Sequence, residues 1–172
     1  MIQTEKMRIC PMEEEQMRQY LAWRYAPPYD FYNIPAEHWE EELQKMREGN
    51  WFAVLKGEKL HGFYEFTFSP EGVEIGLGLS PEAAGWGEGT VFMRHGLEFL
   101  KNHFGYRGKV MLRVLDWNAR ARKVYERTGF RQTGTEQAVS WGRPVCFLRY
   151  ERVIGQPEEA LAGADAENGQ QA

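Results

Sequence analysis

Cysteine is scarce in this sequence, and the scarcity excludes two classes of small protein. Among 172 residues only Cys10 and Cys146 are present, which is too few for a disulfide framework. Neither stands in a Cys-x-x-Cys pair or at a metal-ligand spacing from a histidine, so no metal site is predicted. We expect two buried, reduced thiols, as is usual in the cytoplasm.

Long apolar runs are absent as well. No stretch approaches the roughly 20 apolar residues that a membrane helix needs. The first residues include the charged Glu5, Lys6 and Arg8, which argues against a secretory signal. The sequence therefore predicts a cytoplasmic protein with no membrane partner.

Excess charge is missing from the body of the chain. The net charge is −4, and four acids without a basic neighbour lie in the tail: Glu158, Glu159, Asp165 and Glu167. Without them the acidic residues fall from 25 to 21, which equals the number of Lys and Arg. A neutral body gives no general attraction to nucleic acid, so any anion site has to be local. We expect one domain over residues 1–153 and a disordered acidic tail over 154–172.

Hydrophobic periodicity predicts a mixed α/β fold around a central sheet. Strands are expected at 6–11, 51–55, 60–68, 73–79, 110–115, 130–138 and 144–153, and helices at 13–22, 36–48, 88–104 and 118–127. The strand at 73–79 alternates apolar and non-apolar residues strictly. Between the first two helices, Pro27, Pro28 and Pro35 make a regular helix unlikely.

A glycine-rich loop follows the alternating strand. Residues 80–90 read Ser-Pro-Glu-Ala-Ala-Gly-Trp-Gly-Glu-Gly-Thr, with glycine at every second position before a helix. Such a loop approaches a ligand closely, and its N–H groups with the helix N-terminus form a cradle for an anion. No Lys follows the glycines as in a Walker A loop, and the GxGxG spacing differs from the dinucleotide pattern GxGxxG. An ordinary strand-to-helix turn is the alternative.

A second motif begins at Asn118, which is suited to cap a helix after a strand. Asn118, Ala121 and Tyr125 follow at spacings of three and four and line one side of that helix. Gly129 is a natural helix stop before Phe130.

The two motifs in this order resemble the GCN5-related N-acetyltransferase (GNAT) family, including bacterial members. The motifs cover residues 73–130, and the order of elements extends the match to about 6–153. The resemblance implies a splayed, mostly antiparallel sheet flanked by helices, and acetyl-CoA as the acyl donor. The donor-binding positions it implies are Leu77, Gly78, Leu79, Ala84, Gly85, Trp86, Gly87, Glu88, Gly89, Thr90, Asn118, Ala121 and Tyr125. The family's loop usually starts with Arg or Gln where this chain has Ala84.

The resemblance also suggests catalytic residues. Tyr125 occupies the position that often protonates the departing thiolate, although a core tyrosine is the alternative. Glu74 is a candidate base on the central strand, with Glu65 a weaker one and a water chain also open. We expect His61 and His95 at the surface.

An acceptor site is predicted at Tyr29, Asp30, Phe31, Tyr32 and Asn33, because aromatic rings and a carboxylate suit a cationic amine. An aromatic plug over the core is the competing interpretation. The sequence thus predicts a monomeric or homodimeric N-acetyltransferase that acts on a primary amine of a small molecule or a protein N-terminus. The alternative is a non-catalytic module of the same fold that binds acyl-CoA.

Overall fold

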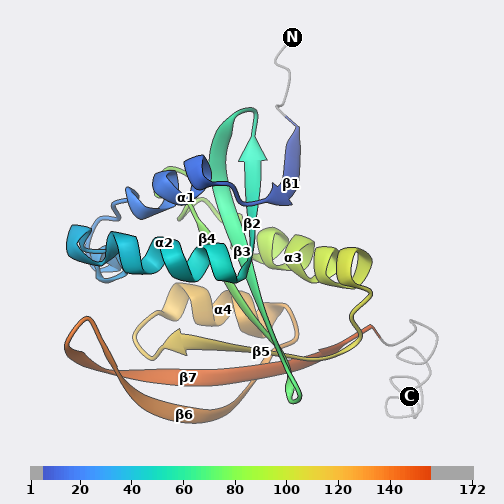
Figure 1. Cartoon of the computed structure of the whole chain (residues 1–172). Helices are drawn as coiled ribbons and strands as arrows, with labels where there is room; N and C mark the ends of the chain where they lie inside the picture. The colour runs from blue at the N-terminus through green and yellow to red at the C-terminus, as the bar shows by residue number, and fades with distance from the viewer. Residues whose placement is uncertain (1–5, 156–172) are drawn as a thin grey trace, which may run out of the picture. The chain divides into compact units, whose positions relative to one another are not determined.

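The computed structural model describes residues 6–155 (Figure 1). Its elements are β1 (Met7–Pro11), α1 (Glu14–Leu21), the 3₁₀ turns η1 (Tyr29–Tyr32) and η2 (Ala36–His38), α2 (Trp39–Glu48), β2 (Asn50–Lys56), β3 (Lys59–Ser69), β4 (Gly72–Leu79), α3 (Gly89–Phe104), β5 (Gly108–Leu115), α4 (Ala119–Arg127), β6 (Arg131–Ser140) and β7 (Arg143–Ile154). The strands form a seven-stranded, mostly antiparallel sheet in the order β1-β2-β3-β4-β5-β7-β6, which confirms the predicted fold class.

The chain divides into two compact units, which β4 and α3 link. Unit 1 comprises residues 6–69 and 74–91 of the described chain, and unit 2 comprises 70–73 and 92–155. The predicted single domain over residues 1–153 stays a prediction, and the predicted disordered tail lies outside the described residues except for its first two positions. Among the described residues, no helix has the length and apolar character needed to cross a membrane.

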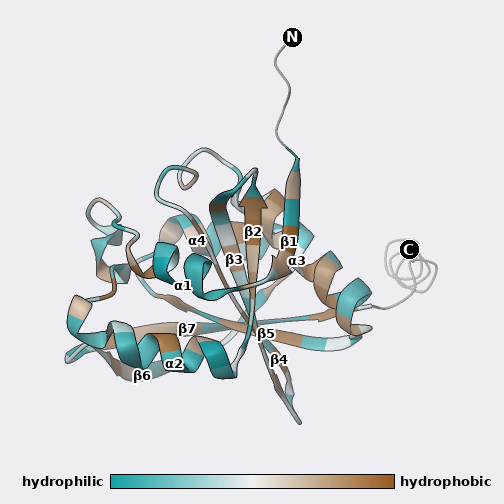
Figure 2. Ribbon diagram, turned by 45° about the horizontal axis from the view of Figure 1, so that its top comes forward, coloured by the Kyte–Doolittle hydropathy of each residue, from teal (hydrophilic) through white to brown (hydrophobic). Residues whose placement is uncertain are grey.

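In unit 1, β1 pairs with β2 and β2 with β3, both antiparallel. The β2–β3 hairpin turns at Gly57, whose φ of 63° lies in the left-handed region that glycine tolerates best. Strand β2 buries four consecutive residues from Phe52 to Leu55, and Figure 2 shows it as largely hydrophobic. The sheet of unit 1 therefore supplies much of its core.

Two amphipathic helices contact this sheet. Helix α1 buries Met17 and Leu21, and α2 buries Leu43 and Met46. Glu14 of α1 accepts two hydrogen bonds from the Arg47 guanidinium of α2, at 2.6 and 3.1 Å. Figure 2 shows that most residues of both helices are hydrophilic. Their apolar stripes, and not helix propensity, account for their placement on the sheet.

Strands β3 and β4 pack closely because Gly78 of β4 has no side chain. A Cβ placed on Gly78 would lie 2.6 Å from Cε1 of Phe63 and 3.2 Å from its Cζ. The Phe63 ring thus covers the backbone of β4 at a point where any larger residue would clash. This packing therefore requires glycine at position 78, whether or not Gly78 also contacts a ligand.

Unit 2 is built on β5, β6 and β7, with β7 pairing antiparallel to both others. Strand β4 begins in this unit, where a Cβ on Gly72 would come within 2.5 Å of the Lys109 carbonyl of β5. Helix α4 contacts β7 through Tyr150, whose hydroxyl donates to the Glu126 carboxylate at 3.0 Å. Tyr150 is almost fully buried, so its ring anchors α4 on the strand.

The expected elements are present with bounds shifted by one to three residues. The largest shift is at α2, which was predicted from Ala36 but starts at Trp39 because the residues after Pro35 form η2. The proline-rich segment contains only the short 3₁₀ turn η1, as its prolines required. The cysteines are free but half-buried, so the expectation of buried thiols was too strong.

Replacing Gly78 with alanine should destabilise the fold by about 1–3 kcal/mol, because the new methyl group overlaps the Phe63 ring. Gly134→Ala is the matched control, since no atom lies within 4 Å of its Cβ position. Urea unfolding of both variants measures the difference. Equal stability of the two variants would contradict this account of the β3–β4 packing.

Candidate functional site

The end of β4 leads into a tight turn that starts the glycine-rich loop. The N–H groups of Ala83 and Ala84 both donate to the Ser80 carbonyl, at 2.9 and 2.8 Å. The Ser80 side chain is buried and accepts a further bond from the Ala83 N–H at 3.3 Å. The Ala84 N–H is therefore occupied within the turn, which corrects its predicted role as a free donor for an anion.

The next six residues, Gly85 to Thr90, differ from Ala83 and Ala84 in their backbone hydrogen bonding. Among the residues described, none accepts a hydrogen bond from the backbone N–H groups of Gly85 to Thr90. Gly85 and Gly87 have φ of 87° and 82°, and no atom lies within 4 Å of a Cβ placed on Gly87. The first N–H groups of α3 add to the set, since a helix leaves them unpaired. Unpaired N–H groups next to an open surface are suited to bind an anion.

Trp86 lies between these glycines and is 79% exposed. Its indole N–H donates to the Glu82 carbonyl at 3.0 Å, which fixes the ring against the first part of the loop. An exposed aromatic ring held in this way offers a flat apolar surface beside the N–H groups.

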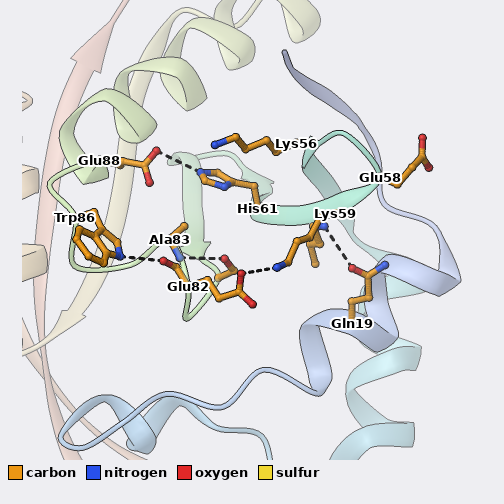
Figure 3. Close-up of a pocket in the computed structure, with 11 residues that line it drawn as sticks. Gln19, Lys56, Glu58, Lys59, His61, Glu82, Ala83, Trp86 and Glu88 are labelled. Atoms are coloured by element: carbon orange, nitrogen blue, oxygen red, sulfur yellow. Dashed lines mark hydrogen bonds and ion pairs between the residues drawn. The ribbon is translucent and has the colours of Figure 1, made fainter. Parts of the chain in front are cut away.

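On one side of the loop lies a cavity of about 690 Å³, drawn in Figure 3. Its walls come from the loop, the β2–β3 hairpin and Gln19 of α1. The Lys59 ammonium pairs with the Glu82 carboxylate, and Nε2 of His61 lies 3.4 Å from Oε1 of Glu88. The wall of the cavity thus carries the Lys59–Glu82 ion pair and the contact between His61 and Glu88.

His61 was expected at the surface, and that expectation is wrong because its side chain is only 10% exposed. Its carbonyl accepts from the Ser80 N–H at 2.8 Å, which joins β3 to the end of β4. The sequence held a signal, since His61 stands two residues before the buried Phe63 and so faces the same side of β3.

The two candidate bases belong to unit 1. Glu74 is half-buried on β4, on the face it shares with Gly76 and Gly78. Glu65 is half-buried on β3, and its Oε1 lies 3.3 Å from where a Cβ on Gly76 would be. The missing side chain at Gly76 therefore leaves room for the Glu65 carboxylate beside the β4 backbone.

The predicted acceptor segment is attached to the end of β4. The Tyr25 hydroxyl donates to the Leu79 carbonyl at 2.6 Å. Asn33 holds the segment in shape, because its Oδ1 accepts from the Tyr25 N–H at 2.8 Å and its Nδ2 donates to the Tyr25 carbonyl at 3.4 Å. Tyr29 to Tyr32 form η1 between these two residues, with Asp30 exposed. Only the fold reveals the contact of Tyr25 with Leu79.

An aromatic cluster packs beside this segment. Rings of Tyr20, Trp23, Trp51 and Phe63 lie with neighbouring centroids 4.7–6.1 Å apart. Burial raises the pKa of the Tyr20 hydroxyl, and Tyr25, Glu42 and Glu65 raise it further. Tyr20 is consequently a neutral member of the cluster.

The second motif lies in unit 2. Asn118 is 8% exposed, and its Oδ1 accepts from the Ala121 N–H at 3.1 Å, which confirms it as the N-cap of α4. The half-buried Tyr125 ring lies 6.3 Å from the Phe130 ring and 6.1 Å from the Tyr150 ring. The same helix thus presents the motif residues and packs against the core of unit 2.

Known proteins share this sequence pattern and this fold. The sequence model of the acetyltransferase (GNAT) family matches residues 11–130, whereas no curated protein matches the chain significantly in sequence. A spermidine N-acetyltransferase from Vibrio cholerae, solved with CoA and spermine, has a TM-score of 0.68 at 19% identity, over 86% of this chain and 95% of that one. A structure described as a putative phosphinothricin N-acetyltransferase has a TM-score of 0.68 at 15% identity, over 88% of this chain and 100% of that one. Identities this low show a shared fold, whereas the family match spans most of the sequence, and the chain therefore belongs to the GNAT family of acetyltransferases.

Proposed function

We propose that this acyltransferase moves an acetyl group from acetyl-CoA to a primary amine by direct attack within a ternary complex. The observation that carries the proposal is the set of unpaired N–H groups at Gly85–Thr90, directly after the strand that bears Leu77, Gly78 and Leu79. The similar fold of an enzyme solved with CoA and spermine supports it. The acceptor is an amine of a small molecule or of a protein N-terminus.

The donor-binding role falls to backbone groups more than to charged side chains. A diphosphate has negative oxygens that N–H groups at a helix N-terminus stabilise. The free set consists of Gly85, Trp86, Gly87, Glu88, Gly89 and Thr90, which leaves out Ala84. Leu77 to Leu79 supply strand backbone for the pantetheine arm, and Asn118 and Ala121 are proposed to contact the donor from α4.

For the acceptor we propose the segment Tyr29–Asn33. The hydrogen bond from Tyr25 to the Leu79 carbonyl supports this proposal, because it attaches the segment to the end of β4. Asp30 offers an exposed carboxylate and its neighbours offer aromatic rings, a combination that attracts a protonated amine before it is deprotonated for attack.

The chemistry needs a proton acceptor for the amine and a proton donor for the sulfur. Acetyl-CoA supplies the thioester, whose carbonyl carbon bonds to the amine nitrogen while the C–S bond breaks. We propose that Glu74 takes the amine proton, directly or through water, with Glu65 as the alternative base beside Gly76. Backbone N–H groups near Gly78 and Leu79 stabilise the oxyanion, a contribution of about 3 kcal/mol per donor. The Tyr125 hydroxyl gives its proton to the thiolate.

Release of free thiol from acetyl-CoA tests the proposal as a whole. The purified chain should release thiol only when an acceptor is present, and a panel of polyamines, small monoamines and peptides with free N-termini should contain at least one. A thiol reagent follows the rate, and mass spectrometry of the acceptor detects the added acetyl group. Donor binding without turnover on every amine would instead favour the non-catalytic alternative.

Gly87→Ala should weaken acetyl-CoA binding about tenfold, because a left-handed φ strains a residue with a Cβ by roughly 1–2 kcal/mol and shifts the N–H groups. Gly142→Ala is matched for strain, with φ of 78° and nothing within 4 Å of its Cβ position, but lies in the β6–β7 turn. Calorimetric titration with CoA compares the two variants. Equal affinity losses would show that strain, and not the loop, explains the effect.

Tyr125→Phe should lower kcat by about 10²–10⁴-fold and leave the KM for acetyl-CoA near that of the wild type, since only proton donation is lost. Phenylalanine keeps the ring contacts with Phe130 and Tyr150. Tyr150→Phe is the control, because it removes a buried hydroxyl bonded to Glu126 and should cost about 1 kcal/mol of stability with kcat retained. An unchanged kcat for Tyr125→Phe at every pH would remove this residue from the chemistry.

A further inference from the structure

Glu88 presents an electrostatic problem within the proposed donor loop. It is the residue directly before α3, so its carboxylate starts among the N–H groups that are proposed to bind a diphosphate. A carboxylate at a helix N-terminus is itself attracted to those N–H groups and repels a second anion. A free Glu88 side chain would therefore compete with the donor for the same groups.

The structure shows where this carboxylate goes. Glu88 points across the cavity wall toward His61, with Oε1 3.4 Å from Nε2, as Figure 3 shows. This contact places the Glu88 carboxylate on the His61 side of the cavity wall.

His61 is held firmly enough to do this. Its side chain is 10% exposed, and its carbonyl accepts the Ser80 N–H, so β3 fixes its position at the base of the loop. The neighbouring pair of Lys59 and Glu82 is far more exposed, at 64% and 75%, and such surface pairs contribute little. The contact between His61 and Glu88 is the more buried of the two links between β3 and the loop.

The glycines of the loop are the reason that the loop needs a contact with β3. Gly85, Gly87 and Gly89 leave the loop backbone with many accessible conformations, and ordering them costs free energy when a ligand binds. One link lies at Glu82, before the first of these glycines, and the other at Glu88, between Gly87 and Gly89.

We propose that His61 is a positioning residue for the donor loop. It draws the Glu88 carboxylate away from the N–H groups of Gly85–Thr90 and leaves them for the diphosphate of acetyl-CoA. This inference rests on the proposed donor site and adds to it a residue on β3 that acts through Glu88. The remaining charged groups on the cavity wall, Lys56 and Glu58 together with the pair of Lys59 and Glu82, are not required for this role.

A double-mutant cycle tests the inference. His61→Gln should weaken CoA binding about tenfold, because the released carboxylate then competes for the N–H groups. Glu88→Gln keeps the backbone N–H and removes the charge, so CoA should bind more tightly than to the wild type. In the double variant His61→Gln/Glu88→Gln, the loss of CoA affinity that His61→Gln causes should disappear, since His61 matters only while Glu88 is charged. Calorimetric titration with CoA gives the four dissociation constants, and the KM of the amine should stay unchanged throughout.

Several results would overturn the inference. Equal weakening by His61→Gln with and without Glu88→Gln would make His61 a purely structural residue. Weaker binding by Glu88→Gln alone would contradict it even if His61→Gln does not fold. Lys59→Gln, which breaks the exposed pair on the same cavity, should stay within about twofold of the wild type. A wild-type chain that binds no CoA would instead refute the proposed donor site itself, so the two failures are distinguishable.

Discussion

The proposed donor site depends on backbone N–H groups that the fold leaves without acceptors. Within the described chain the turn at Ser80 uses the N–H groups of Ala83 and Ala84, but those of Gly85 to Thr90 have no partner. Most backbone donors in a folded protein are paired, so a run of unpaired ones beside open space is a feature that a ligand can use. This arrangement explains how a chain whose body is electrically neutral can present a site for a highly charged donor.

The second constraint on the site is that Gly76 and Gly78 of β4 have no side chains. Gly78 leaves room for the Phe63 ring, and Gly76 leaves room for the Glu65 carboxylate, so two residues of β3 reach the backbone of β4. The Tyr25 hydroxyl reaches the next residue, Leu79. Strand β3 and the segment before η1 thus meet β4 at positions 76, 78 and 79, near the end of that strand. Substitutions near the end of β4 are expected to affect both the packing of this strand and the proposed acetyl transfer.

The charge at the proposed donor loop depends on neighbouring side chains and not on the net charge of the molecule. Glu88 lies in the loop where a diphosphate is proposed to bind, and its carboxylate points toward the partly buried His61. In the proposed arrangement, this contact lets an acidic residue precede a helix without closing its N-terminus to an anion. The long-range field of a neutral body would not provide such control.

The sequence by itself determined the order of the elements, the fold class and the family. Strict alternation in 73–79, the glycine spacing of 85–89 and the motif of Asn118, Ala121 and Tyr125 are local patterns, and local patterns can be read without knowing the fold. The start of α2 was missed because a 3₁₀ turn and the first turn of an α-helix have similar sequences. Only the tertiary structure showed that the Ala84 N–H is occupied, that Tyr25 bonds to Leu79, and that the partly buried His61 lies beside Glu88. These contacts join residues 4, 54 and 27 positions apart, and most such pairings are decided by how strands and loops pack, which no local pattern records.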